Sequence, residues 1–529
     1  MVNRQGPRVR LWSMVSGAIA AASFLSVAEA VALVATPSGG PFVAIGGVVI
    51  DVIPRPLKEI AISVFGEFDK IALLIGLGLA ALVAAAMAGL LQYRRRPLGV
   101  AVLAAAGALA LAASVTRPGA SSFAWLPSAV GAVVGAVVLM LLISRLRTWA
   151  ASDASSAAPE NHAEPQPRAK GSIDRRSFFR ATALVGASAA IVGVSTRIVN
   201  AATSSVSALR DELRLPAPGR KVTIPGGADL DVDGLSPIIT ANSDFYRVDT
   251  ALVVPEVDSS TWTLSITGMV DEPVRLDLRD LFDMGLDEYA ITLTCVSNEV
   301  GGDLVGNAVW LGVPVRDVLA RARPQEGADM VLSRSVDGFT ASTPLASLTD
   351  TALDAIIAVG MNGEPLPLEH GFPVRMVVPG LYGYVSATKW LTELKVTTFA
   401  EDEAYWTPRG YSAKAPIKLS SRIDTPRPGT PVAPGRVTIA GMAWAQTVGI
   451  DRVEVSIDDG AWQSATLSNP INQDTWVQWT LAWDATPGTH YVAVRAVDDD
   501  GRRQIEEKAP IYPNGSSGWQ RLLVTVADE

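Results

Sequence analysis

The sequence predicts three regions in order along the chain: N-terminal transmembrane α-helices, a soluble α+β domain and a C-terminal immunoglobulin-like β-sandwich. Hydrophobic residues make up 49% of the 529 positions and charged residues 18%, and the apolar excess lies in residues 1–200 rather than in 205–529. From residue 415 onward, Pro and Gly separate short alternating segments, a spacing typical of an all-β sandwich. The length also predicts several domains, since single hydrophobic cores stop growing near about 250–300 residues.

The first region, residues 1–148, holds four segments that are long enough to cross a bilayer, because a spanning helix needs about 20 apolar residues. These segments are residues 12–35, 71–92, 98–116 and 124–144. Arginine clusters precede the first segment and follow the second and the fourth, so all clusters lie on one side if all four segments span. Positive charge marks the cytoplasmic side of a membrane protein. Residues 41–66 are interrupted by prolines and charged residues, which predicts an interfacial or re-entrant element.

A polar cytoplasmic linker is predicted over residues 149–174, because its Ala, Ser, Pro and Glu residues cannot bury enough apolar surface to fold. Arg175 and Arg176 then precede an apolar run, which predicts a fifth transmembrane helix over 175–200. The pattern is similar to a twin-arginine export signal, and ordinary positive flanking of a fifth span is the alternative. Both interpretations place the chain after residue 200 outside the cytoplasm.

Two classes of function are disfavoured by composition. The net charge is −9 and the soluble region has no basic patch with interleaved aromatic residues, which argues against nucleic-acid binding. The three histidines are His162, His370 and His490, and none lies in a predicted span. A haem between two histidines is therefore excluded from the membrane region, which we interpret as an anchor rather than an electron-transfer subunit.

The α+β domain is predicted over residues 205–412. Residues 260–270 alternate like a strand, and residues 273–281 read as a strand followed by a helix start. Residues 313–324 have helical spacing, and residues 370–396 read as strands separated by glycine turns. The β-sandwich is predicted over residues 415–529, where Asp-Asp-Gly at 458–460 is a hairpin signal.

Cys295 is the only cysteine, so no disulfide can form within this sequence. It follows an apolar strand and precedes a Ser-Asn-Glu turn and a glycine pair. Three interpretations remain open from the residue alone: a small buried apolar side chain, a nucleophile, or a metal ligand.

Four motifs stand out in this cysteine's domain: "TLTCVSN" (292–298), "NAVWLGVPVRDVL" (307–319), "MNGEPLPLEHGFPVRMVVPG" (361–380) and "ATKWL" (387–391). Together they resemble the sulfite oxidase family of molybdenum enzymes. The resemblance covers residues 225–400, and residues 415–527 resemble the family's C-terminal immunoglobulin-like domain. It implies a sulfite-oxidase-type molybdopterin-binding domain of α+β fold.

The resemblance also implies a cofactor and a set of site residues. Molybdenum would be bound by Cys295 and by the two sulfurs of one molybdopterin, since soft thiolates suit such a centre. Catalytic roles are implied for Cys295, Trp310 and Arg247. The residues implied in cofactor binding are Asn242, Phe245, Tyr246, Arg247, Cys295, Asn298, His370, Arg375, Ser386 and Lys389.

One position departs from the family. Eukaryotic sulfite oxidases have an arginine directly after the motif's asparagine, where this chain has Glu299. A carboxylate in a partly buried site would repel a sulfite dianion, which favours a neutral or cationic substrate or a sulfoxide. Tyr405, Trp406 and Arg409 either line the substrate mouth or pack the domain junction.

We therefore expect a membrane-anchored, extracytoplasmic oxidoreductase that transfers an oxo group and two electrons to or from a small substrate. An external electron carrier, a c-type cytochrome or a quinone-linked protein, is the expected partner, and the sandwich permits a homodimer. One alternative is a hydrolase using Cys295 and His370. Another is a cofactor-free receptor or adhesion protein on the same fold.

Overall fold

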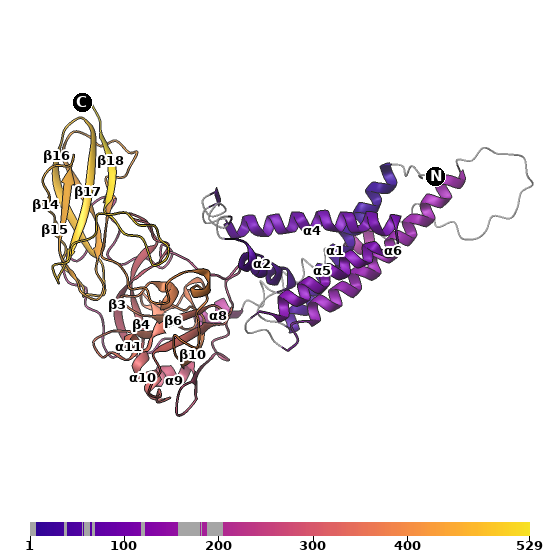
Figure 1. The fold of residues 1–529 in the computed structure, drawn as a ribbon, viewed down its shortest axis with the longest axis horizontal. Helices are drawn as coiled ribbons and strands as arrows, with labels where there is room; N and C mark the ends of the chain where they lie inside the picture. The colour runs from indigo at the N-terminus through magenta and orange to yellow at the C-terminus, as the bar shows by residue number, and fades with distance from the viewer. Residues whose placement is uncertain are drawn as a thin grey trace, which may run out of the picture. The chain divides into compact units, whose positions relative to one another are not determined.

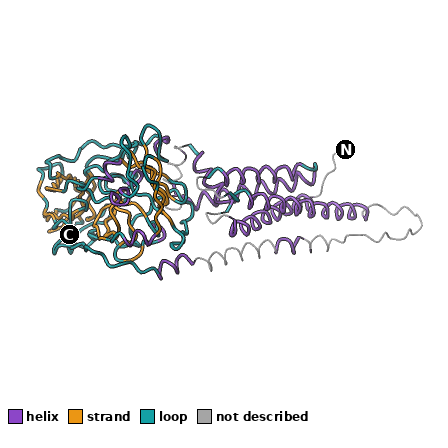
Figure 2. Tube along the Cα trace, turned by 90° about the horizontal axis from the view of Figure 1, so that it is seen from below, coloured by secondary structure: helices purple, strands orange, loops and turns teal. Residues whose placement is uncertain are grey.

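The computed structural model describes residues 7–35, 40–54, 57, 64–65, 69–117, 122–156, 180, 182–187 and 205–528. The chain divides into two compact units. One comprises Met1–Ser205 with Ala251–Val254, and the other comprises Val206–Thr250 with Pro255–Glu529. Figure 1 labels their elements, and Figure 2 shows that strands are confined to the second unit.

The first unit is helical. Its longer elements are α1 (Pro7–Ala35), α2 (Pro41–Val52), α4 (Asp69–Arg94), α5 (Leu98–Val115) and α6 (Leu126–Ser156). Four of these are long and apolar enough to cross a membrane, over Arg8–Ala32, Lys70–Arg94, Leu98–Val115 and Leu126–Ala151. The four helices predicted from hydropathy are thus confirmed as helices. The predicted interfacial segment contains the 12-residue helix α2.

Small residues let these helices approach closely. A Cβ on Gly17 of α1 would clash with the carbonyl oxygen of Ala85 in α4, and a Cβ on Gly89 would clash with that of Ser13. Apolar helices without a hydrophobic driving force between them associate by this kind of close backbone packing. The glycines therefore set the α1–α4 contact.

Helix α6 continues to Ser156, eight residues beyond the boundary predicted at 148. The rest of the predicted linker, 157–174, and the pair Arg175-Arg176 lie outside the described residues. Of the predicted fifth helix, residues 182–187 are helical, and most of the others are also outside the description.

The second unit begins with α8 (Ser205–Glu212) and contains two five-stranded sheets in its first domain. The first sheet has the order β2-β1-β10-β5-β6. Its strands are β1 (Thr263–Gly268), β2 (Val274–Asp277), β5 (Met330–Ser335), β6 (Thr340–Pro344) and β10 (Leu391–Thr397). Strands β1 and β10 pair in parallel, and the other pairs are antiparallel.

The second sheet has the order β3-β4-β7-β8, with β9 also paired to β7. Its strands are β3 (Asp287–Thr294), β4 (Val305–Pro314), β7 (Ile356–Met361), β8 (Glu364–Pro365) and β9 (Arg375–Val377). All six residues of β7 and the last six of β3 are buried, as expected for strands covered on both faces. Leu264, Val359 and Leu394 belong to one apolar cluster that joins the two sheets.

Short helices complete this domain. They are α9 (Leu278–Asp283), α10 (Val315–Ala320), α11 (Leu345–Thr349) and the 3₁₀ turns η2 (Leu368–His370), η3 (Gly383–Val385) and η4 (Thr407–Arg409). The helix predicted over 313–324 is therefore shorter than expected, because β4 runs through Pro314 and the backbone of Arg323 is left-handed, with φ of 51°.

The C-terminal domain is a sandwich of two four-stranded sheets, β11-β12-β16-β15 and β14-β13-β17-β18. The strands are β11 (Ser420–Thr425), β12 (Gly435–Trp444), β13 (Ile450–Ile457), β14 (Gln463–Ser464), β15 (Thr466–Leu467), β16 (Val477–Ala485), β17 (Gly488–Asp498) and β18 (Gln520–Val526). Asp458 and Asp459 have φ of 54° and 55° in the turn from β13 to β14, so the hairpin signal is confirmed.

The sandwich contacts the segment that follows Cys295. Arg422 donates to the carbonyl of Gly302 (2.9 Å), and the hydroxyl of Ser516 donates to the carbonyl of Asn298 (2.6 Å). Trp476 donates its indole N–H to the carbonyl of Ile238 (2.8 Å). The first two bonds hold the loop behind the cysteine from the side of the C-terminal domain, and the third fixes the segment around Ile238.

Candidate functional site

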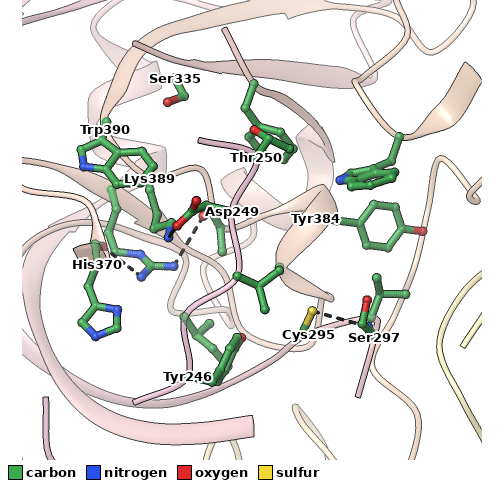
Figure 3. Close-up of a pocket in the computed structure, with 18 of the residues that line it drawn as sticks. Tyr246, Asp249, Thr250, Cys295, Ser297, Ser335, His370, Tyr384, Lys389 and Trp390 are labelled. Carbon is green, nitrogen blue, oxygen red and sulfur yellow. Dashed lines mark hydrogen bonds and ion pairs between the residues drawn. The ribbon is translucent and has the colours of Figure 1, made fainter. Parts of the chain in front are cut away.

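Cys295 opens into a cavity of about 920 Å³, a volume that includes its solvent-open part. Figure 3 shows side chains from several elements converging on this space. The lining comprises Phe245, Tyr246, Val248, Asp249, Thr250, Leu293, Cys295, Val296, Ser297, Ser335, Asp337, Phe339, His370, Arg375, Gly383, Tyr384, Ala387, Lys389, Trp390, Trp406 and Tyr411. A cavity that combines apolar walls with a few polar groups is typical of cofactor and substrate sites.

The cysteine is placed by the end of β3, one residue beyond Thr294. Its N–H donates to the carbonyl of Leu304 (2.9 Å), and its Sγ accepts from the N–H of Ser297 (3.4 Å). Burial raises the pKa of the thiol, while the Ser297 amide and the charge of Lys389 oppose that rise. The thiol is therefore protonated by itself and would lose its proton on binding a metal.

Three basic side chains line the side of the cavity opposite the thiol. Figure 3 shows His370 and Lys389 there, away from Cys295 and Ser297. The guanidinium of Arg375 donates to the carbonyls of His370 (3.1 Å), Met376 (3.3 Å) and Ala387 (3.4 Å). Within residues 205–528 it makes no ion pair with a carboxylate, so a buried positive charge faces this part of the cavity.

The pKa values of these groups follow their burial. Burial lowers the pKa of Arg375 to about 10, which leaves it charged. Burial, reinforced by Arg375, lowers the pKa of His370 to about 4, so the imidazole is neutral. Burial lowers the pKa of Lys389 to about 8, against the effect of Asp249, whose carboxylate lies 2.8 Å from its Nζ.

Aromatic rings form the wall between these groups and the core. The ring of Phe245 stacks on Tyr246 (5.3 Å between centroids) and meets the rings of Trp310 and His370 edge-on at 5.7 and 5.5 Å. Gly306 makes room for it, since a Cβ there would lie 2.8 Å from its Cε2. Burial raises the pKa of Tyr246, and the nearby Cys295 adds to this effect.

The structure brings six of the predicted site residues to the cavity lining: Phe245, Tyr246, Cys295, His370, Arg375 and Lys389. The other five, Asn242, Arg247, Asn298, Trp310 and Ser386, are not among the lining residues.

Each of these five has another contact. Trp310 is fully buried behind Phe245, with Arg375 stacked 5.0 Å from its ring. The hydroxyl of Ser386 donates to the carbonyls of Leu381 and Tyr382. Their predicted roles stay predictions, and direct contact with a ligand in the cavity would require movement of these side chains.

The remaining three residues contact lining residues or the turn after the cysteine: Asn242, Arg247 and Asn298. The carbonyl of Asn242 is hydrogen-bonded to Nε2 of His370 (3.1 Å). Arg247 pairs with Asp249 (2.9 Å), which also holds Lys389. The side chain of Asn298 accepts from the N–H of Leu304 (3.0 Å) and closes the turn after the cysteine.

Several lining residues were not predicted from the sequence. Asp337 and Ser335 lie in a loop and at a strand end without a motif, so no pattern marks them, and Asp249 was not singled out within its segment. Tyr384 and Tyr411 likewise carried no signal. Of the three residues considered for the mouth, Trp406 lines the cavity, while Tyr405 and Arg409 lie outside the lining.

A set of contacts behind His370 was also not predicted from the sequence. Arg210 of α8 donates to the carbonyls of Pro365 (2.8 Å) and Leu366 (2.9 Å) and pairs with Glu364 (3.0 Å). Glu364 in turn accepts from the side chain of Asn242 (2.5 Å). Helix α8 therefore fixes the backbone that positions the imidazole of His370.

Glu299 is exposed and is not among the lining residues. The sequence argument against sulfite assumed a carboxylate in a partly buried site, and that premise is wrong. The repulsion of an exposed charge is screened by water and salt.

Two observations define what the site can hold. Among the described residues, no group of three or more His, Cys, Asp or Glu side chains could hold a metal ion, so a metal at Cys295 needs ligands brought by another molecule. The buried charge of Arg375 suits an anionic group such as a phosphate. A cofactor that carries both metal-binding sulfurs and a phosphate fits these donors.

Comparison with known proteins also indicates a cofactor of this kind. Residues 251–406 match the model of an oxidoreductase molybdopterin binding domain, and residues 420–494 match a bacterial Ig domain. The chain is 32% identical to human mitochondrial sulfite oxidase over 342 residues, which are 55% of this chain and 62% of that protein. It is 30% identical to the sulfite oxidase of Arabidopsis thaliana over 354 residues, which are 55% of this chain and 89% of that protein.

A solved structure is also similar. The sulfane dehydrogenase SoxCD from Paracoccus pantotrophus aligns with a TM-score of 0.48 and 23% identity, covering 56% of this chain and 85% of that chain. The chain spans only about 62% of the length of the mammalian mitochondrial sulfite oxidases that it matches.

Proposed function

Because this chain belongs to the sulfite oxidase family of molybdopterin-dependent oxidoreductases, we propose that it exchanges an oxygen atom and two electrons with a small substrate at Cys295. The cofactor of this family is molybdenum bound to molybdopterin. The observation that supports the proposal most is the position of the single thiol, which faces a cavity whose opposite side carries buried Arg375 and Lys389.

In this proposal Cys295 binds the metal as a thiolate, and Arg375 and Lys389 face the cofactor's phosphate. When bound, the cofactor supplies the two-electron redox change and the exchangeable oxygen atom. Neutral His370 donates from Nε2 to the carbonyl of Asn242 (3.1 Å), which fixes the ring and leaves Nδ1 as a hydrogen-bond acceptor. Tyr246 keeps its proton near neutral pH, so its hydroxyl is available as a donor beside the thiol.

Four helices that are long and apolar enough to span a bilayer support a membrane anchor. Arg8 and Arg10 precede the first, Arg94–Arg96 follow the second, and Arg145 and Arg147 lie near the end of the fourth. With these clusters in the cytoplasm, and with the fifth span predicted over residues 175–200 crossing back, we propose that residues 205–529 lie on the extracytoplasmic side.

A separate electron carrier is the partner in this proposal. One cysteine and three histidines in the sequence do not make an iron–sulfur or haem ligand set beside the molybdenum site. Electrons would therefore pass to or from a c-type cytochrome or a quinone-linked protein.

The possible homodimer through the sandwich can be checked by light scattering of the purified chain.

The hydrolase alternative loses support from the geometry. The two ring contacts of His370 within the cavity wall are to the carbonyl of Asn242 and to Phe245, and no hydrogen bond joins it to the thiol. A nucleophile and its base are expected within hydrogen-bonding reach.

The test is the metal content of the full chain, made in a host that synthesises molybdopterin. Stoichiometric molybdenum and pterin are expected for the natural protein. Cys295→Ser should lower molybdenum content and turnover by at least about ten-fold, as losses at metal-site groups do, without unfolding the chain. Ser464→Ala, at an exposed residue of β14, is the control. A natural protein without molybdenum, or full turnover by Cys295→Ser, would refute the proposal.

A further inference from the structure

One segment of the chain is divided between the two compact units. Residues up to Thr250 belong to the unit with the sheets, Ala251–Val254 belong to the helical unit, and the chain returns to the first of these at Pro255. We call residues 245–254 the strap. The strap contains no helix or strand, so no ladder of backbone hydrogen bonds holds it. Its position therefore depends on contacts with other elements.

The first half of the strap forms a wall of the cavity. Its lining residues are Phe245, Tyr246, Val248, Asp249 and Thr250, three of which Figure 3 labels. The carboxylate of Asp249 lies 2.8 Å from Nζ of Lys389, and the hydroxyl of Thr250 donates to Asp337 (3.3 Å). This half is thus tied to the basic side of the cavity.

At Arg247 the wall is a single layer of chain. Arg247 is exposed and is not among the lining residues, whereas its neighbours Tyr246 and Val248 line the cavity. The cavity therefore lies on one side of the strap and solvent lies on the other. If the strap moved outward at this point, water would enter the cavity and a bound group could leave.

The second half of the strap is held within the helical unit. The ammonium of Lys70, at the start of α4, donates to the carbonyl of Ala251 (2.9 Å). Leu252 packs on α2, since a Cβ on Gly46 would lie 2.8 Å from its Cδ1. Ala251 is buried. One charged hydrogen bond and one apolar contact thus locate this half on two helices.

The two halves cannot move independently. Thr250 and Ala251 are joined by one peptide bond, and consecutive Cα atoms lie about 3.8 Å apart. Asp249 is only one residue further, and its carboxylate pairs with both Arg247 and Lys389. A shift of Ala251 away from the cavity would therefore pull on the residues that hold these charges.

From this arrangement we propose that the helical unit, in addition to anchoring the chain, fastens a wall of the cavity through Lys70 and Leu252. Lys70 is a positioning residue, because it acts through Ala251 and does not touch a ligand. The fastened strap keeps Asp249 beside Lys389 and keeps the cofactor enclosed. The consequence for the cofactor rests on the proposed function, whereas the fastening itself does not.

Hydrogen exchange of the full chain in lipid nanodiscs measures the fastening. Lys70→Met removes the donor and keeps the side-chain length at the end of an apolar helix, so membrane insertion is preserved. We expect the amides of residues 246–250 to exchange at least about ten-fold faster, a ratio that corresponds to about 1.4 kcal/mol, because the strap opens more often. Lys70→Arg keeps a charged donor and should restore most of the natural rate.

A second variant tests the apolar contact. Leu252→Ala should also accelerate exchange over residues 246–250. The matched control is Leu109→Ala in α5, where the same side chain is 70% exposed and is distant in sequence from the strap. This control should leave the strap at its natural rate. Residues 439–443 of the sandwich should exchange alike in all variants, which distinguishes opening of the strap from general unfolding.

The consequence for the cofactor is measured without turnover. After dilution of chain made in a host that synthesises molybdopterin, the released pterin is followed by its fluorescence. Release should be several-fold faster in Lys70→Met and Leu252→Ala than in Lys70→Arg, Leu109→Ala or the natural protein.

Four results would overturn the inference. These are natural exchange rates over residues 246–250 in Lys70→Met and Leu252→Ala, equal acceleration by Leu109→Ala, no rescue by Lys70→Arg, and unchanged pterin release. A natural protein that holds no pterin would instead refute the proposed function, and the exchange rates would still decide whether the helices fasten the strap.

Discussion

At the scale of single residues, buried charge determines what the cavity accepts. Arg375 carries its charge among three carbonyl oxygens, and Lys389 shares Asp249 with Arg247. Burial of a cation without full neutralisation is costly unless a ligand supplies the counter-charge. The same environment keeps His370 neutral, so protonation of this residue opposes folding.

The stability of the chain should therefore depend on His370 at acidic pH. Burial lowers its pKa to about 4, against about 6.5 in an unfolded chain. Between these values the unfolded state binds a proton that the folded state does not, so stability falls as the pH drops from 6.5 to 4. The full effect is roughly 3 kcal/mol, at about 1.4 kcal/mol per pKa unit.

Thermal melting of His370→Gln and of the natural protein between pH 7 and 4 measures this contribution. The natural protein should lose more stability than the variant on acidification. His490 provides a control of opposite sign, because the hydrogen bond to Asp458 raises its pKa. Its contribution is present at low pH and lost as the pH rises. Parallel curves for His370→Gln and the natural protein would contradict the assignment.

At the scale of elements, the β3–β4 hairpin carries the site. Strand β3 ends one residue before Cys295, and β4 contributes Gly306 and Trp310. Register pairs Leu293 with Gly306, so a residue without a side chain stands beside the thiol strand where Phe245 must fit. The backbone of one strand thus determines where the aromatic wall of the cavity can lie.

Gly306→Ala should disturb this wall. The added Cβ would lie 2.8 to 3.2 Å from three atoms of the Phe245 ring, which is confined by Tyr246, Trp310 and His370. Overpacking of this kind costs about 1–3 kcal/mol. We expect a lower melting temperature and lower molybdenum content. Gly226→Ala, where an added Cβ meets nothing within 4 Å, is the matched control. Equal metal content in the two variants would argue against a positioning role for Gly306.

The elements also explain which predictions from sequence held. The length of the apolar segments predicted the four N-terminal helices, and alternation with turn residues predicted the sandwich, because both patterns are local. The length of α10 and the end of α6 depend on packing, which no local pattern contains.

Part of the site could be predicted because family motifs, too, are local patterns in the sequence. Family motifs located Cys295, Arg375 and Lys389 along the chain, but a motif does not say where a side chain points. Ser386 bonds to carbonyls of its own turn, and Glu299 lies in solvent. Asp249 and Asp337 reach the cavity only through the tertiary fold, so their spacing in the sequence carried no signal.

At the scale of the whole molecule, the chain combines a helical unit with a second unit that contains the β-sheets. The helical unit has close glycine contacts, whereas the second unit contains the cavity that Cys295 lines. This division supports an anchor whose role is to place the catalytic unit at one membrane face. The side of the membrane decides which electron carriers are available to it.

The proposed orientation makes a labelling prediction in which the single native thiol is an advantage. In a Cys295→Ser background, Glu507→Cys places a thiol at an exposed residue of the sandwich, and Arg95→Cys places one at an exposed residue between α4 and α5. A membrane-impermeant maleimide should label position 507 in intact spheroplasts, whereas position 95 should require permeabilised membranes, because arginine-rich loops stay in the cytoplasm. Both positions should react equally after detergent treatment, which shows that each thiol is accessible. Labelling of position 95 but not 507 in intact cells would reverse the topology and place the redox site in the cytoplasm, where a periplasmic cytochrome could not reach it.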